Sequence, residues 1–174
     1  MGIQFETDYN METLTAMAKG LRKTVRKKRS RRVHIFAAVV LILGLLTILA
    51  TTAGGEPLGA SGVVTLLAML VVILVTVFED RLNAWFARKR LLPGTEHAVA
   101  TFEEDGYVSA TGVTESRFSY AQIVAVAETA RYFVFALSSH HTQAYDKRTI
   151  RGGSVEDFRA FIAEKTGKPV EDIK

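Results

Sequence analysis

The sequence contains no cysteine, only three prolines and, between residues 33 and 78, a single charged residue, Glu56. Without cysteine the chain cannot form a disulfide, a cysteine-ligated zinc site, an iron–sulfur cluster or a thiol nucleophile. It also lacks the glycine patterns of Walker A and Rossmann nucleotide sites and the G-x-S-x-G elbow of serine hydrolases. Its 174 residues leave room for one small domain together with membrane helices.

Two long uncharged runs, residues 33–53 and 58–78, fill most of this weakly charged stretch. A helix of either length is about 31 Å long, which matches a hydrocarbon core of about 30 Å. Only residues 54–57 separate the runs, so they predict an antiparallel transmembrane hairpin with both chain ends on one side. A secretory signal is excluded because the first run is too long and starts too late. The competing interpretation is a pair of core helices in a soluble protein.

Basic residues gather at both ends of the predicted hairpin and are absent from its turn. The positive-inside rule therefore predicts a multi-pass protein of the cell membrane with both termini in the cytoplasm. Trp85 and Phe86, just past the second run, are candidate interfacial anchors. The candidates for contact with the membrane surface or anionic lipid are Lys19, Arg22, Lys23, Arg26, Lys27, Lys28, Arg29, Arg31, Arg32, Arg88, Lys89 and Arg90.

Three interpretations compete for this basic cluster. It could serve as a topology signal with general attraction to anionic head groups, or as a dedicated patch for lipid or protein. Nucleic acid is disfavoured because no aromatic residue is interleaved among the bases between Lys19 and Arg32. No nucleic-acid partner is therefore expected, and the lipid bilayer is the expected partner of this segment.

The amino-terminal segment, residues 1–32, predicts a short strand followed by a basic amphipathic helix. Alternation around Ile3 and Phe5 indicates the strand. Spacings of three and four residues indicate one helix stripe, which comprises Met11, Leu14, Ala18, Leu21 and Val25. We expect this helix to run straight into the first membrane span, although Gly20 weakens it by about 1 kcal/mol relative to alanine.

Past an interfacial helix and linker over residues 79–94, residues 95–174 form a predicted α+β domain. Strands are predicted at 98–102, 107–111, 117–120, 122–128, 131–137 and 142–145. An amphipathic helix then begins after the cap Ser154, with Asp157 at its third position, and ends at Gly167 and Pro169. The predicted core comprises Phe102, Phe118, Ile123, Val126, Phe133, Phe135, Phe158 and Phe161.

The sequence predicts no catalytic, cofactor-binding or metal-binding residue. His140 and His141 are adjacent and have no apparent third ligand, so a solvated turn is the better interpretation. Glu128 and Thr129 precede Arg131, which predicts a strand-end turn with a local ion pair. Gly152-Gly153-Ser154 could bind an anion, but a loop and a helix start explain the same residues.

One stretch of the predicted domain resembles the YcxB-like family of bacterial membrane proteins. The stretch runs from Phe118 to Phe133 and contains the aromatic–isoleucine–V-x-E-T–aromatic pattern of the family. Asp146-Lys147-Arg148 and the helix of Phe158 resemble a later family element, with Asp146 where proline is usual. The resemblance implies a pleckstrin-homology-like fold, in which one helix caps a curved sheet, and a place in the bacterial inner membrane. It implies no catalytic residue.

These observations favour a non-enzymatic integral membrane protein without a cofactor. We expect the hairpin to anchor a cytoplasmic module that binds a protein segment or a lipid head group. The alternative is a small accessory subunit of a transporter or envelope complex that acts through the hairpin. In that case small residues on the second run would pack against a protein partner or a second copy, namely Gly59, Ala60, Gly62 and Ala68.

Overall fold

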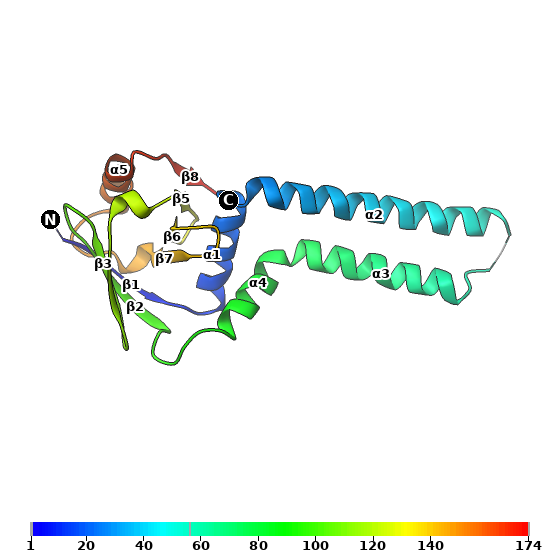
Figure 1. Cartoon of the computed structure of the whole chain (residues 1–174), viewed down its shortest axis with the longest axis horizontal. Helices are drawn as coiled ribbons and strands as arrows, with labels where there is room; N and C mark the ends of the chain where they lie inside the picture. Colours follow the sequence, from blue (N-terminus) through cyan, green and yellow to red (C-terminus); the bar gives the residue numbers. More distant parts are fainter. Residues whose placement is uncertain (1, 56, 174) are drawn as a thin grey trace.

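A sheet domain and two long helices that project from it make up the computed structural model, which describes residues 2–55 and 57–173 (Figure 1). The class is α+β, as predicted. The helices are α1 (Met11–Lys23), α2 (Lys27–Ala53), α3 (Ala60–Val77), α4 (Glu79–Arg88) and α5 (Val155–Thr166). The strands are β1 (Ile3–Asp8), β2 (His97–Phe102), β3 (Tyr107–Thr111), β4 (Glu115–Phe118), β5 (Ala125–Glu128), β6 (Tyr132–Ala136), β7 (Thr142–Asp146) and β8 (Val170–Asp172). Two 3₁₀ turns are η1 (Tyr120–Gln122) and η2 (Lys147–Thr149).

The strands form two sheets of four. Sheet A has the order β1-β2-β3-β4 and is antiparallel throughout. Sheet B has the order β7-β6-β5-β8, in which only the β5–β8 pair is parallel. Strand β1 pairs with β2, with Phe5 opposite Ala100, so the segments 1–32 and 95–174 belong to one folded unit. The long helices α2 and α3 are therefore an insertion between two adjacent strands of sheet A.

The carboxy-terminal domain has the predicted strands with three corrections. The strand predicted at 117–120 is shifted to Glu115–Phe118, because Ser119 caps the turn η1. The strand predicted at 122–128 is shortened to Ala125–Glu128, since that turn occupies its first residue. Strand β8 was missed because three residues carry no readable alternation.

The predicted core residues are buried except for Phe118 and Phe161, which are only partly buried at its margin. Sequence reasoning missed Phe5, Tyr107 and Tyr145, which are buried in the same cluster. The two tyrosines are tolerated there because both hydroxyls donate to Gln143 Oε1, each at 2.7 Å.

Helix α5 begins and ends as predicted. The Ser154 hydroxyl accepts from the Asp157 amide at 3.0 Å, and the Asp157 carboxylate accepts from the Ser154 amide at 3.1 Å. These two bonds form a capping box, which satisfies amides at the helix start. Gly167 ends the helix with a φ of +63°, a left-handed conformation that favours glycine.

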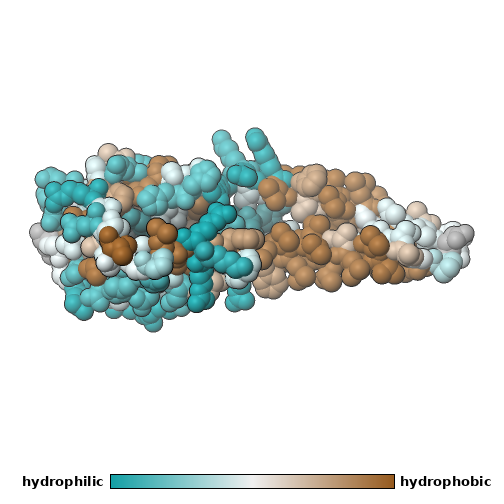
Figure 2. All heavy atoms as spheres, turned by 60° about the horizontal axis from the view of Figure 1, so that its bottom comes forward, coloured by the Kyte–Doolittle hydropathy of each residue, from teal (hydrophilic) through white to brown (hydrophobic). Residues whose placement is uncertain are grey.

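Helices α2 and α3 lie side by side in an antiparallel hairpin, and both are long and apolar enough to span a membrane (Figure 1). Only 6% of the apolar window of each is buried, unlike a core helix of a soluble protein. Their apolar side chains form the broad hydrophobic surface of Figure 2. Relative to the predicted runs, α2 starts earlier, at Lys27, and α3 is shorter. The predicted turn at 54–57 includes Glu56, which lies outside the described residues.

The prediction that the amino-terminal helix continues into the first span is wrong. Helix α1 ends at Lys23, and α2 starts at Lys27 after a sharp turn through Val25. In Figure 1, α1 runs across the long axis of the hairpin instead of along it. The reason lies in its packing, since α1 lies against sheet B on one side and contacts α4 on another.

Candidate binding surfaces beside helix α1

Helix α1 forms a layer between sheet B and the hairpin, and its position is set by polar contacts at its start (Figure 1). The Asn10 side chain caps it by accepting from the amides of Glu12 and Thr13 at 2.9 and 3.0 Å. The Thr13 hydroxyl donates to the Asp8 carbonyl at 2.6 Å and lies 3.2 Å from the Tyr132 hydroxyl on β6. These contacts join α1 to both sheets.

Gly20 lets the other end of α1 approach sheet B closely. A Cβ atom at Gly20 would lie 2.6 Å from Cγ1 and 3.0 Å from Cβ of Val134 on β6. A larger residue could not occupy this position without displacing a stiff, buried side chain. The glycine that weakens the helix in isolation is therefore a packing requirement of the fold.

An ion pair braces α1 against α4. Arg22 donates from Nε and Nη2 to the two oxygens of Asp80, at 2.7 and 2.6 Å. Glu79 lies 3.9 Å from the same guanidinium. The hydrogen bond to Asp80 raises the pKa of Arg22 above its ordinary value. Arg22, one of the predicted membrane-surface cations, is thus already paired with carboxylates.

A groove of about 1090 Å³ lies on one side of α1, between this helix, β8 and the β5–β6 turn. We call it the groove. Five cations and three carboxylates line it, a surplus of two positive charges. The apolar part of its lining includes Met11, Ala16, Val170 and Ile173.

An ion triad centred on the buried Glu128 lines the groove. Glu128 is 8% exposed and accepts from Lys147 Nζ at 2.8 Å and from Arg159 Nε and Nη2 at 2.7 and 2.8 Å. The Arg159 hydrogen bond, with help from Lys147, holds the pKa of Glu128 below its ordinary value despite burial. The predicted ion pair between Glu128 and Arg131 is wrong, because the partners of Glu128 come from η2 and α5, far along the chain.

Arg131 instead links the groove wall to β7 and α1. Its Nε and Nη2 donate to Asp146 Oδ2 at 3.0 and 2.9 Å, and its Nη1 pairs with Glu12 on α1. Asp146 also accepts from Arg148 at 2.9 Å. Asp146 therefore binds two arginines, Arg131 and Arg148.

Two cations of the groove take no part in these ion pairs. Lys19 on α1 and Arg81 on α4 line the groove, and no carboxylate lies in ion-pair range of either among residues 2–55 and 57–173. Lys19 was a predicted membrane-surface residue, whereas Arg81 carried no prediction. The structure brings the two together through the α1–α4 contact, which no sequence pattern indicates.

A second cavity, of about 550 Å³, lies on the opposite side of α1, where α2 and α4 meet the domain. We call it the hollow. Its lining includes Arg26, Arg29, Val33, Phe86, Arg90 and His140. Arg26 donates from Nε to the carbonyl of Ser139 at 2.6 Å, which fixes one guanidinium at its edge. The hollow thus gathers four of the predicted basic residues, since Arg22 on α1 also lines it.

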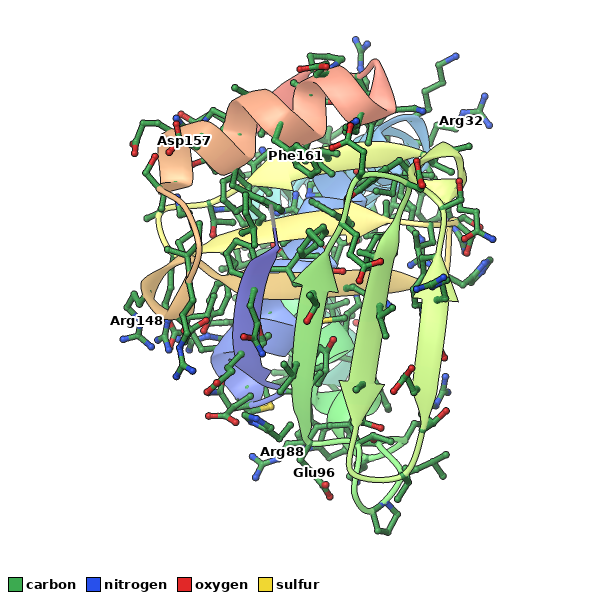
Figure 3. All side chains as sticks on the ribbon, turned by 90° about the vertical axis from the view of Figure 1, so that its left-hand side faces the viewer. Arg32, Arg88, Glu96, Arg148, Asp157 and Phe161 are labelled. Carbon is green, nitrogen blue, oxygen red and sulfur yellow. The ribbon has the colours of Figure 1, made fainter. Side chains whose placement is uncertain are left out.

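The remaining predicted cations lie around the end of the hairpin nearest the domain and are exposed, as are Arg29 and Arg90 of the hollow. These remaining cations are Lys23, Lys27, Lys28, Arg31, Arg32, Arg88 and Lys89. Figure 2 shows hydrophilic side chains where the domain meets the apolar hairpin. In Figure 3, Arg32 and Arg88 project on opposite sides of the domain, so these cations form a collar and not one patch.

The predicted aromatic anchors Trp85 and Phe86 are half exposed on α4 and contact each other edge to face at 4.9 Å. Lys89 Nζ lies 3.6 Å from the centre of the Trp85 ring. His140 and His141 lie in the exposed β6–β7 turn. In the part of the chain that the structure describes, no group of three potential metal ligands occurs.

The small residues predicted to contact a partner helix differ in exposure. Gly62 lies beneath its own neighbour, since a Cβ atom there would be 2.5 Å from Leu58 Cδ2. Gly59, Ala60 and Ala68 are exposed. Within the hairpin, the close approach instead occurs at Gly44, which packs against the Met69 side chain.

Comparison with known proteins gives one match. Residues 102–162 match the sequence model of the family described as YcxB-like protein. No curated protein and no solved structure matches the chain. The matched segment supplies Glu128, Arg131, Lys147 and Arg159 of the groove, whereas β1, α1 and α4 lie outside it. The chain therefore carries a YcxB-like domain, and the resemblance found in its sequence is confirmed over these residues.

Proposed function

We propose that this protein spans the cytoplasmic membrane with its hairpin and holds a binding module against the cytoplasmic leaflet. Two observations support this placement. Apolar side chains cover the outside of α2 and α3 along most of their length (Figure 2). The collar of cations lies at the end next to the domain, and positive charge near membrane helices favours the cytoplasmic side. Both chain ends would then be cytoplasmic.

The module itself would be pleckstrin-homology-like. Support comes from the order of elements, with β1 to β4 in one sheet, β5 to β7 in the other and α5 at the end. In this proposal the hairpin interrupts the fold between β1 and β2, and β8 is an added strand.

The observation that carries the proposal is the double attachment of the hairpin to the domain. One end is connected to α1 by the turn at residues 24–26 and the other leads into α4, and the Arg22–Asp80 ion pair joins these two helices. A domain held in this way would keep one face against the bilayer instead of moving freely on a linker. Fixed geometry raises the effective concentration of the module towards other membrane-bound molecules, so weak binding would suffice.

The groove favours an acidic protein segment as the ligand. Its volume of about 1090 Å³ lies at the upper limit of small-molecule sites, which usually occupy about 300–1,000 Å³. Lys19 and Arg81 would supply the positive charge for carboxylates, and Met11 and Ile173 the apolar contact. Binding is proposed instead of catalysis because the carboxylate of Glu128 is already engaged by two cations.

Site-specific photo-crosslinking in intact membranes tests this function. A photoreactive amino acid at Thr15, which lines the groove, should crosslink a segment that peptide mapping identifies as rich in Asp and Glu. Lys19→Gln with Arg81→Gln should abolish the product, whereas Lys28→Gln with Arg32→Gln, an equal charge change in the collar, should leave it intact.

A photoreactive residue at Glu115 on the outer strand β4 provides the positional control. Equal products from both positions, or adducts to lipid alone at Thr15, would contradict a protein ligand in the groove.

A further inference from the structure

The hollow differs from the collar in how its cations are arranged. Arg26 and Arg29 belong to the start of α2, and Arg90 follows α4, yet all three line one cavity. The bond from Arg26 to the Ser139 carbonyl holds its guanidinium against the β6–β7 turn, so the third wall comes from the domain. Cations from separate segments therefore converge here.

Positive charge in the hollow is not balanced by the protein. Four arginines and one carboxylate, Glu79, line it. Arg22 already has Asp80 as its partner. Arg29 and Arg90 have no carboxylate in ion-pair range among the residues that the structure describes. Like charges held close together are unfavourable unless an anion joins them, which makes an anionic ligand the natural occupant.

Because the cations of the hollow are arginines, a phosphate is the favoured anion. A guanidinium presents a planar fork of donors that matches the oxygens of a phosphate, whereas an ammonium acts as a point charge. Each cation of the hollow is an arginine. In the collar, by contrast, lysine and arginine are mixed.

The position of the hollow favours a phosphate that belongs to a lipid over a free phosphate ion. Val33 on α2 and Phe86 on α4 line the same cavity, and each is 51% exposed. Both lie where the apolar hairpin leaves the domain. A ligand that fills the site would therefore present an anionic group to the arginines and an apolar portion to these side chains.

We infer that the hollow is a specific site for one anionic phospholipid. Arg26, Arg29 and Arg90 bind its phosphate. The inference rests on the proposed placement of the hairpin in the membrane, but it does not depend on the groove. A lipid would then occupy the hollow on one side of α1, and a protein segment the groove on the other side.

Two double variants with the same change in charge distinguish a specific lipid site in the hollow from non-specific electrostatic attraction. Arg29→Gln with Arg90→Gln removes two cations of the hollow, and Arg31→Gln with Arg32→Gln removes two exposed cations of the collar. The full chain would be purified in mild detergent with phosphatidylglycerol and phosphatidylcholine, and the lipid retained per protein counted by native mass spectrometry. Circular dichroism would verify that each variant is folded.

We expect the wild type and the collar variant to retain one phosphatidylglycerol, and the hollow variant to bind it at least tenfold more weakly. Millimolar inorganic phosphate should not displace the lipid, because it lacks the apolar portion. Equal losses in both variants would overturn the inference in favour of general electrostatics, and so would equal retention of phosphatidylcholine. Displacement by inorganic phosphate would assign the site to a free anion. Each of these results would leave membrane insertion and crosslinking in the groove unaffected.

Discussion

Arg22 and Asp80 form a two-point ion pair although 58 residues, including the whole hairpin, separate them in the chain. Their side chains are 21% and 17% exposed, so the pair is largely shielded from water. It connects α1, which follows the first strand, to α4, which precedes the second. The two chain segments that enter and leave the hairpin are thereby fixed to each other beside the domain.

Breaking this pair should destabilise the α1–α4 layer. Arg22→Met and Asp80→Asn should each lower the free energy of unfolding by about 1–2 kcal/mol, between the values for exposed and buried pairs. The double variant should lose less than the sum, because the second change removes a charge that already lacks its partner. Urea unfolding in mild detergent, followed by fluorescence of Trp85 on α4, measures this. Strict additivity would show that the two residues do not interact.

Gly20→Ala should reveal the close contact between α1 and β6. Alanine favours a helix by about 1 kcal/mol, but its Cβ would lie 2.6 Å from Val134 Cγ1, and overpacking costs about 1–3 kcal/mol. We expect net destabilisation in the wild type. In a Val134→Ala background the contact with Cγ1 is removed and only the 3.0 Å approach to the Cβ atom of residue 134 remains, so the same change should destabilise less. An equal effect in both backgrounds, by thermal unfolding, would contradict this packing.

What the sequence predicts correctly depends on how far apart in the chain the contacting residues lie. Local patterns predicted the α5 capping box of Ser154 and Asp157, since a cap depends on residues three apart. The same reasoning assigned Glu128 to nearby Arg131, whereas its partners are Lys147 and Arg159. Contacts made by distant segments leave no periodic signal. The groove and the hollow are built from such contacts, so the sequence predicts their residues only as charges and not how they are arranged.

The amino-terminal strand should be essential for the domain, although the family match begins only at residue 102. Phe5 is fully buried among Phe102, Phe133 and Phe158, with ring centres 4.7 to 6.4 Å away. Phe5→Ala should therefore lower the free energy of unfolding by about 3–5 kcal/mol. Gln4→Ala, a neighbour whose side chain is not buried, is the control. Similar resistance of both variants to limited proteolysis would contradict the place of β1 in the core.

Acid sensitivity of the domain should depend on Glu128. Its pKa is lower in the folded state than its ordinary value of 4.5, because Arg159 and Lys147 bind the carboxylate. The stabilisation is therefore present above that value and is lost as the pH falls below it. Glu128→Gln should be less stable at pH 7 and should lose less stability between pH 5 and pH 3. Glu115→Gln, at an exposed position on β4, should behave as the wild type in both thermal and urea unfolding.

The most direct test of the proposed membrane placement is labelling of single cysteines in intact cells, which is feasible because the chain has no cysteine of its own. Ala53→Cys would mark the end of α2 next to the hairpin turn, and Ala121→Cys would mark an exposed site in the domain. We expect a membrane-impermeant maleimide to label Cys variants at position 53 in intact cells, and those at position 121 only after lysis. Labelling of the domain from outside, or release of the protein by carbonate without detergent, would contradict a hairpin that spans the membrane with the domain in the cytoplasm.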